Sequence, residues 1–513
     1  MPMNNLPQLA PGELEPAVDL VTVYHQKTGE EMKLQLSAIS TPLPSGILKT
    51  ALPLSSTPQV VTDGSETQSP LRLSTTDVTN RGGGSLASNT AFGLSALDSN
   101  TTGVDNTAFG SSALTANVIG GANTAMGHEA LALSTGNNNT AVGRHALTTL
   151  STGSANTAVG TSALRLSTGS NNTAIGFEAA TANTTGLALT AIGWRALYNN
   201  TSAQGNTAVG NTSLFSNTTG AHNTAIGFSA LFSNVTTSFN TAIGSSALFT
   251  NIGDYNTAVG YETLRYNATG ANNTGMGYQA LLNNTNSNNT AVGYRSLRAN
   301  TSGSQNVGVG VDALLSNTTG TSNVAVGYQA ANGNTTGSNN VAFGLSSLLS
   351  NTTGSYNVAI GGDALRTNTA SSNIGIGYQS GYLNSSGTSI IGIGYEALKS
   401  NVSGNNNIGI GSESLRSNAS GNNNVAVGIR ALKDNSASNN TAVGYQAGFT
   451  ITSGTGNLCL GYGAEPSAAT ASNEISFGSA TVNAGTIATE VVVSDTTWAV
   501  RINGTAYKIL LKA

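Results

Sequence analysis

The hydrophobic positions of this chain recur within one short frame. The frame reads Asn-Thr-Ala-Val-Gly, two variable positions and then Ala-Leu, and it returns every 16 or 17 residues from about residue 86 to about residue 480. The glycine of the frame runs from Gly93 to Gly478 in about 23 intervals, a mean period of about 16.7 residues. Such self-similarity predicts one short supersecondary unit that is stacked many times.

Residues 256–272 serve as an example of one unit. The segment from Asn256 to Gly260 predicts a strand of about five residues, because it is short, holds Thr, Ala and Val, and lies between Asn and Gly. We expect a second extended piece around Thr263 to Arg265. The residues from Asn267 to Gly270 predict a turn that Gly270 closes with a positive φ. A helix is disfavoured because only about six residues separate the glycine from the next turn.

The predicted fold class is therefore all-β, an elongated parallel β-roll or β-solenoid of about 24 coils. Strands stacked about 4.8 Å apart would form a rod on the order of 115 Å long. Alternate strand residues point to opposite faces, and both Ala and Val of the frame are apolar, so we expect both faces to be buried.

The Leu of the Ala-Leu element adds a further apolar column. If this column were exposed, it would exceed the apolar patch that a monomer tolerates, so we expect the rods to associate with one another. The column comprises Leu97, Leu114, Leu131, Leu147, Leu164, Leu197, Leu214, Leu231, Leu248, Leu264, Leu281, Leu314, Leu348, Leu365, Leu398, Leu415 and Leu432.

The composition limits what else the chain can do. With 8% charged residues, 5% aromatic residues and 63 glycines, it cannot build several ordinary hydrophobic cores. A net charge of -4 offers no basic stripe for nucleic acid. The single cysteine, Cys459, is expected to be a small buried residue. Because the first residues show neither a secretory signal nor a membrane span, we expect synthesis in a cytoplasm and no membrane insertion.

The NTAVG, NTAIG and NVAVG frames resemble the repeats of phage tail-fibre proteins. They are similar in kind to the head repeats of trimeric autotransporter adhesins. Such an adhesin would need an N-terminal signal and a C-terminal membrane barrel, and we predict neither here, which favours the phage fibre. The resemblance covers residues 86–480 and implies a parallel homotrimer on the virion tail. We expect no enzymatic activity, because the sequence shows no nucleophile elbow, phosphate loop or zinc-protease motif.

The two ends complete the predicted organisation. Residues 1–41 contain two alternating segments, Leu20 to Tyr24 and Met32 to Leu36, and resemble the N-terminal segments that attach fibres to tail or baseplate proteins. Residues 42–85 are rich in Pro and Ser and predict an extended neck, and residues 86–480 form the shaft.

At the C-terminal end, residues 481–513 predict a small β cap or tip. Thr489 to Val493 would supply one strand, and the Asn503-Gly504 dipeptide predicts a hairpin between two more.

Candidate chemistry is sparse. His25, His128, His145 and His222 occupy different repeat positions without an evident ligand motif, so we predict no metal site and no cofactor. Phage tailspikes often cut polysaccharide with paired carboxylates, which makes a polysaccharide-degrading tailspike the enzymatic alternative. The scattered acidic residues favour solvated turn positions over catalysis. They are Asp254, Glu262, Asp312, Asp363 and Glu396.

One position stands out, because the residue after the repeat glycine is often aromatic. In-register stacking predicts a ladder of rings, which serves either as structural stacking or as a glycan-binding strip, and we favour the structural role. The ladder comprises Phe177, Trp194, Phe228, Tyr261, Tyr278, Tyr294, Tyr328, Tyr378, Tyr395, Tyr445 and Tyr462.

The leading hypothesis is a homotrimeric structural phage tail fibre that contributes to recognition of host cell-surface glycan. A head or neck fibre is the runner-up, beside the tailspike. The Thr of the frame also suggests an ice-binding solenoid, although one Thr column is fewer than the two that a flat ice face usually needs.

Overall fold

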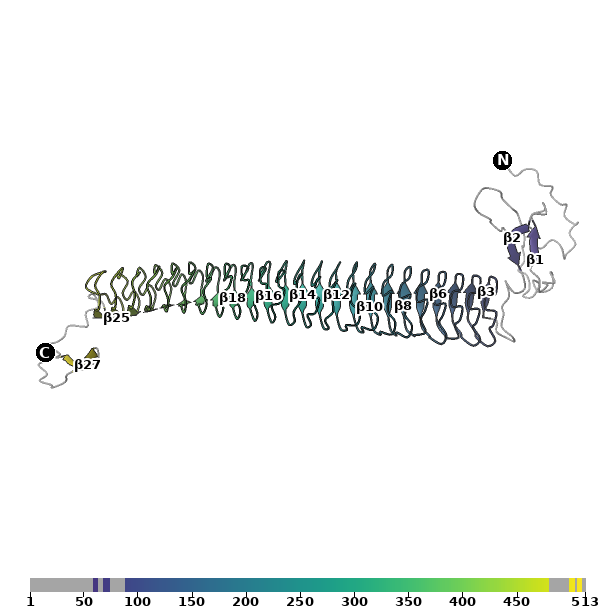
Figure 1. Cartoon of the computed structure of the whole chain (residues 1–513), viewed down its shortest axis with the longest axis horizontal. Helices are drawn as coiled ribbons and strands as arrows, with labels where there is room; N and C mark the ends of the chain where they lie inside the picture. The colour runs from purple at the N-terminus through teal and green to yellow at the C-terminus, as the bar shows by residue number, and fades with distance from the viewer. Residues whose placement is uncertain (1–58, 63–67, 74–87, 479–497, 503–504, 510–513) are drawn as a thin grey trace, which may run out of the picture. The chain divides into compact units, whose positions relative to one another are not determined.

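A computed structural model describes residues 59–62, 68–73, 88–478, 498–502 and 505–509 (Figure 1). The chain divides into two compact units, residues 1–204 and 205–513. Strands and turns make up the described residues, which include no helix and hence no helix that could cross a membrane. The predicted all-β class is therefore confirmed for this part of the chain.

The first unit contains an antiparallel pair, β1 (Gln59–Thr62) with β2 (Gln68–Leu73), within the stretch that we expected to be an extended neck. It continues with seven parallel strands that pair in chain order. These are β3 (Thr90–Phe92), β4 (Thr107–Phe109), β5 (Thr124–Met126), β6 (Thr140–Val142), β7 (Thr157–Val159), β8 (Thr173–Ile175) and β9 (Thr190–Ile192).

The second unit contains seventeen further parallel strands, again paired in chain order. They are β10 (Thr207–Val209), β11 (Thr224–Ile226), β12 (Thr241–Ile243), β13 (Thr257–Val259), β14 (Thr274–Met276), β15 (Thr290–Val292), β16 (Val307–Val309), β17 (Val324–Val326), β18 (Val341–Phe343), β19 (Val358–Ile360), β20 (Ile374–Ile376), β21 (Ile391–Ile393), β22 (Ile408–Ile410), β23 (Val425–Val427), β24 (Thr441–Val443), β25 (Leu458–Leu460) and β26 (Ile475–Phe477).

Each coil of the repeat contributes one strand, and equivalent residues face each other across the ladder. In the pair β10 and β11, for example, Thr207 faces Thr224 and Ala208 faces Ala225. This is the predicted parallel solenoid, with strands of three residues in place of five. The prediction of a second extended segment is wrong. Thr263 to Arg265 lie in turns, and both Glu262 and Leu264 have positive φ.

The repeat glycine makes the corner at the end of each strand. Gly227 has φ +137°, a conformation that L side chains rarely adopt, and a Cβ added there would lie 2.5 Å from the carbonyl oxygen of Gly244. The same corner continues with positive φ at Ser229 and Leu231. A glycine is therefore required at this position both by the backbone conformation and by the close approach of the next coil.

Ala and Leu fill the apolar half of the interior. Ala225 in the strand and Leu231 after the corner are both fully buried, and the Ala and Leu residues at the same positions of the other coils are likewise buried. Our expectation of an exposed Leu column is thus wrong. The Leu residues, which have positive φ, are buried inside their own chain, so this column does not drive association.

Asparagine fills the other half of the interior, a role that the repeat pattern alone did not reveal. The Oδ1 atom of Asn223 accepts from the backbone N–H of Asn240 at 2.9 Å, and its Nδ2 atom donates to the carbonyl oxygen of Thr237 at 2.8 Å. A second ladder connects Asn234 with Asn251, whose Nδ2 donates to Asn234 Oδ1 at 3.1 Å. These buried amides satisfy the backbone groups of the turns from one coil to the next.

The prediction that Gly270 closes the Asn-Thr turn with a positive φ is wrong. Gly270 is not among the glycines with positive φ, and it is Asn272 that has φ +57°. A Cβ on Gly270 would lie 2.3 Å from the carbonyl oxygen of Asn286 and 2.4 Å from Asn267 Oδ1. Close packing against the next coil and the Asn ladder, not backbone conformation, therefore selects this glycine.

Near the C-terminus, β27 (Trp498–Ile502) pairs antiparallel with β28 (Thr505–Ile509), as the Asn503-Gly504 signal predicted. The other predicted end strands, Leu20 to Tyr24, Met32 to Leu36 and Thr489 to Val493, lie outside the described residues.

Candidate functional site

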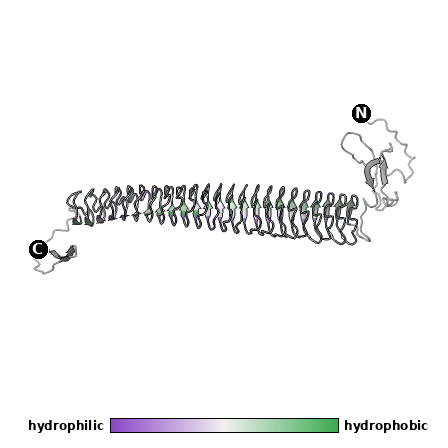
Figure 2. Cartoon of the chain, viewed as in Figure 1, coloured by the Kyte–Doolittle hydropathy of each residue, from purple (hydrophilic) through white to green (hydrophobic). Residues whose placement is uncertain are grey.

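The outward face of the strands presents a column of large apolar residues. In each strand from β3 to β25 the middle residue is buried while its two neighbours point outward, so the Thr and the Val or Ile of the frame share one outer face. Ile226 is 38% exposed and Phe343 is 56% exposed. The expectation that both faces are buried is therefore wrong within a single chain, and Figure 2 shows hydrophobic colour along these strands.

The predicted aromatic column follows the repeat glycine, next to this face along the chain. All eleven side chains are partly exposed, from 41% at Tyr445 to 58% at Phe228 and Tyr462. Their shared repeat position places rings of neighbouring coils above one another. The column is thus a surface feature and not part of the core.

Rings of this column stack on one another in three groups of neighbouring coils. Tyr278 stacks on Tyr261 with ring centroids 5.4 Å apart and on Tyr294 at 5.2 Å. The pairs Tyr378 with Tyr395 and Tyr445 with Tyr462 stack at 5.7 Å and 5.3 Å. These distances are close to the spacing of about 4.8 Å between neighbouring strands of a sheet, so stacking follows from the fold and needs no ligand.

Charged residues border the aromatic column. The guanidinium of Arg195 lies 4.5 Å from the ring centroid of Trp194, and that of Arg295 lies 4.9 Å from Tyr294. The charge of Glu262, together with its hydrogen bond, raises the pKa of Tyr261. The edge therefore combines exposed rings with cations and hydroxyl groups, the groups that a sugar ring can contact.

Two further aromatic columns escaped the sequence prediction. Phe232 stacks between Phe215 and Phe249 at 5.1 Å, and Phe239 stacks between His222 and Tyr255 at 5.3 Å and 5.1 Å. Alignment of every coil on its repeat glycine would have shown both columns, since each occupies one fixed position of the repeat.

The candidate carboxylates for glycan hydrolysis each have a neighbouring polar or basic partner. Asp312 makes a bidentate pair with Arg295 at 2.9 Å and 3.0 Å. Asp363 lies 3.5 Å from Arg366, and Ser238 N–H donates to Asp254 at 2.7 Å. Glu262 pairs with Arg265 and accepts from Gln279 at 2.8 Å. These contacts join or brace coils.

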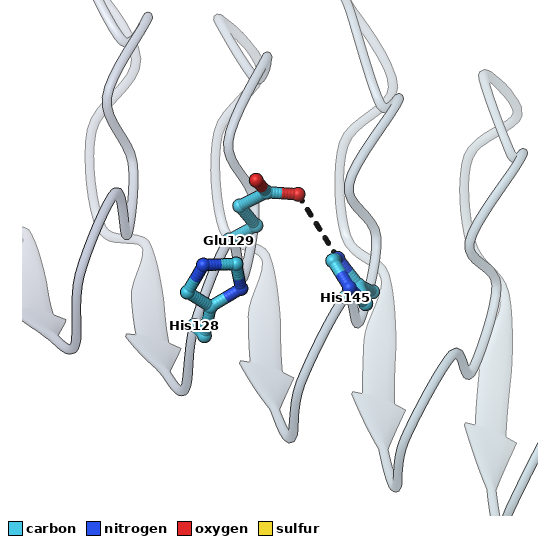
Figure 3. A group of neighbouring side chains, drawn as sticks. All are labelled: His128, Glu129 and His145. Carbon is cyan, nitrogen blue, oxygen red and sulfur yellow. Dashed lines mark ion pairs between the residues drawn. The ribbon is translucent and has the colours of Figure 1, made fainter.

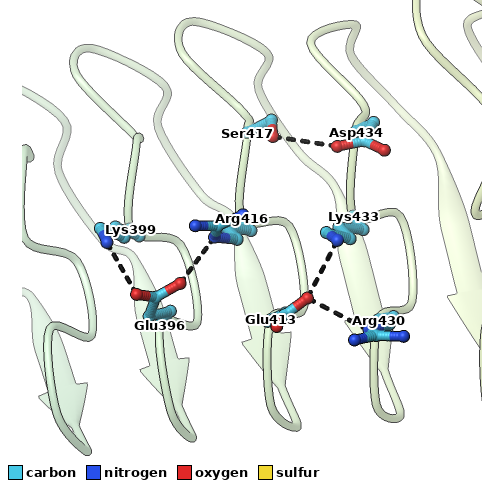
Figure 4. A network of polar contacts seen from close by, with 8 residues as sticks. All are labelled: Glu396, Lys399, Glu413, Arg416, Ser417, Arg430, Lys433 and Asp434. Carbon is cyan, nitrogen blue, oxygen red and sulfur yellow. Dashed lines mark hydrogen bonds and ion pairs between the residues drawn. The ribbon is translucent and has the colours of Figure 1, made fainter.

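Two further networks surround Glu396 and Glu413 (Figure 4). Burial of the Glu396 carboxyl, which raises its pKa, is outweighed by the hydrogen bond from Lys399 and the charge of Arg416, both at 2.7 Å, so the pKa is lowered. A hydrogen bond from Lys433 lowers the pKa of Glu413 against the effect of burial, with Arg430 adding to it.

One cluster combines imidazole and carboxylate donors, and sequence spacing had not grouped it. His128, Glu129 and His145 bring their ligand atoms within 4.8 Å of one another. The residues come from adjacent coils, so only the stacking of the coils reveals the group.

Comparisons with known proteins give no further guide to the surface. No protein-family model matches the chain, and no curated protein or solved structure matches it.

Proposed function

We propose that the chain is a structural phage tail fibre, a trimeric rigid rod attached to the virion through its N-terminal segment. The proposal combines the resemblance of the repeats to tail-fibre proteins with the parallel solenoid of each unit. In a solenoid every coil is fixed to the next by strand bonds and Asn ladders, so the structure suits a stiff spacer.

The observation that carries the proposal of self-association is the outward column of the strands. Ile226, Ile243, Met276, Ile360 and Ile410 are between 37% and 44% exposed at the same repeat position. A continuous apolar column of this kind favours contact with another surface. An identical chain with the same period offers matching spacing along the whole column, and a closed cyclic arrangement would cover it.

The partly exposed aromatic column gives the fibre a candidate surface for host glycan. Rings with neighbouring cations suit the apolar faces and hydroxyl groups of sugars. Contact with host-surface glycan is accordingly part of the proposed function, with stacking as the structural role of the same residues.

Electron microscopy of phage particles labelled with an antibody against this chain tests the proposal. We expect label along fibres that project from the tail. Label at the head or neck would assign the chain to another appendage, and absence of label from particles that carry all their proteins would overturn the virion assignment.

A further inference from the structure

The cluster of His128, Glu129 and His145 lies on one corner of two adjacent coils in the first unit (Figure 3). Glu129 and His145 are both the second residue after a repeat glycine, Gly127 and Gly143 respectively. Stacking of the coils therefore brings the Glu129 carboxylate and the His145 ring together, with Oε2 3.0 Å from Nδ1.

The backbone holds these residues in place. Glu129 and His145 have φ of +55° and +58°, the conformation that recurs at this repeat position. The backbone N–H of His145 donates to the carbonyl oxygen of His128 at 2.9 Å. The rings of His128 and His145 lie edge to face with centroids 5.4 Å apart. Two imidazoles and a carboxylate are thus presented by fixed corners.

Ion pairs at the same repeat position show what is unusual here. Arg195 pairs with Glu178 at 2.7 Å, and Arg430 pairs with Glu413 at 3.1 Å, each between adjacent coils. At Glu129 the basic partner is a histidine, which can be neutral, and a second histidine stands beside it. Both Glu129 and His145 can therefore serve as metal ligands, whereas an arginine at the position of His145 has no lone pair to offer a metal.

We propose that His128, Glu129 and His145 bind a divalent transition-metal ion of the Zn²⁺ type, with water completing the coordination. Two imidazole nitrogens and one carboxylate oxygen are a donor set that Zn²⁺ accepts. Ligands of a tetrahedral Zn²⁺ at about 2.0–2.1 Å from the metal lie about 3.3 Å from one another. The three donor atoms, now within 4.8 Å, reach that spacing by rotation of side chains.

The three side chains are accessible to solvent, which leaves them room to rotate toward a metal ion. His128 is exposed, while the side chains of His145 and Glu129 are 21% and 39% exposed, so an ion reaches the site from solvent without opening a coil. A bound ion would connect the coils of β5 and β6 and stabilise their stacking.

The test uses the full-length chain freed of metal with a chelator and titrated with ZnCl₂ in a calorimeter. We expect one Zn²⁺ per chain. His145→Arg keeps an ion pair of the kind seen at Arg195, and His128→Ser introduces a residue that the repeat uses at Ser111. Each variant should bind Zn²⁺ at least about tenfold more weakly. The matched control His222→Asn, which uses the residue found at Asn272, should leave the affinity unchanged.

Substitution with Co²⁺ provides a second readout on the unaltered chain. Visible absorption of a tetrahedral Co²⁺ site is expected to appear on titration and to vanish on addition of Zn²⁺. Absence of saturable Zn²⁺ binding, or affinity unchanged in both His128→Ser and His145→Arg, would overturn the proposal. All three ligands belong to one chain, so this result is independent of whether the chain is a phage fibre or a trimer.

Discussion

Two neighbouring glycines allow the corner of the repeat to be tested in isolation. Gly361 is a repeat glycine with φ +123°, and an added Cβ would lie 2.7 Å from the carbonyl oxygen of Gly377. Gly362, the next residue, has no positive φ, and the nearest atom to its added Cβ is in the ring of Tyr378 at 3.4 Å. The two substitutions Gly361→Ala and Gly362→Ala thus add the same methyl group to opposite environments.

The expected cost at Gly361 has two parts. An alanine held in a sparsely populated backbone region costs about 1–3 kcal/mol. Forcing a methyl group against the backbone of the next coil costs about another 1–3 kcal/mol. Together these destabilise the local coils by about 2–6 kcal/mol. Gly362→Ala should be neutral or stabilise by about 0.4–1 kcal/mol, because alanine restricts the unfolded chain.

Hydrogen exchange followed by mass spectrometry measures this difference coil by coil. A loss of 2 kcal/mol corresponds to about thirtyfold faster exchange. We expect this acceleration or more in Gly361→Ala for peptides that cover β19 and β20, with distant coils unchanged. Equal protection of these peptides in the two variants would refute the account of the corner.

The remaining predictions concern a thiol, two carboxylates and the stacking period. Burial, with smaller effects of Glu465 and Glu474, raises the pKa of Cys459 to about 11; a thiol reagent at pH 8 should therefore leave the native chain unlabelled and label one site after denaturation, and rapid native labelling would contradict burial. Because the pKa values of Glu396 and Glu413 are lowered, their stabilisation is complete above the ordinary glutamate pKa of about 4.3 and is lost as pH falls through the lowered values. The unfolding temperature of the unaltered chain should consequently fall more steeply on acidification below pH 5 than that of Glu396→Gln/Glu413→Gln, which uses the residue found at Gln379 and Gln446; parallel curves would show that the two networks add nothing. Deletion of residues 328–344, one whole coil, should keep the chain folded by circular dichroism, whereas deletion of residues 328–335 should not, and equal folding of both would argue against stacked coils.

Much of the fold could be predicted from the sequence because the repeat is short and regular. The period and the Ala of each strand were sufficient for a parallel all-β solenoid, and Cys459 is buried in β25 as expected. The course of the chain after Gly260 was not predictable from residue preferences. Positive φ at Glu262 and Leu264 is uncommon for such residues. We expected the Leu column on the surface of the chain, but Leu264 and its equivalents are buried.

The candidate surfaces were predictable only in part. The aromatic column follows directly from the position after the glycine, as the stacked rings of Tyr261, Tyr278 and Tyr294 show. The group of His128, Glu129 and His145 depends on which residues of adjacent coils adjoin, and the two histidines occupy different repeat positions. Buried Asn side chains such as Asn223 likewise resemble ordinary turn residues until the ladder that they form is seen.

The mass of the full-length chain in solution tests the central proposal of association through the outward strand column most directly. One chain has a mass of 51.4 kDa. Light scattering on the purified protein, over a range of concentrations, should give about 154 kDa, three times that mass, if the exposed column is covered in a homotrimer. A mass of one chain at every concentration would contradict the proposal, because the apolar column would then remain exposed to water.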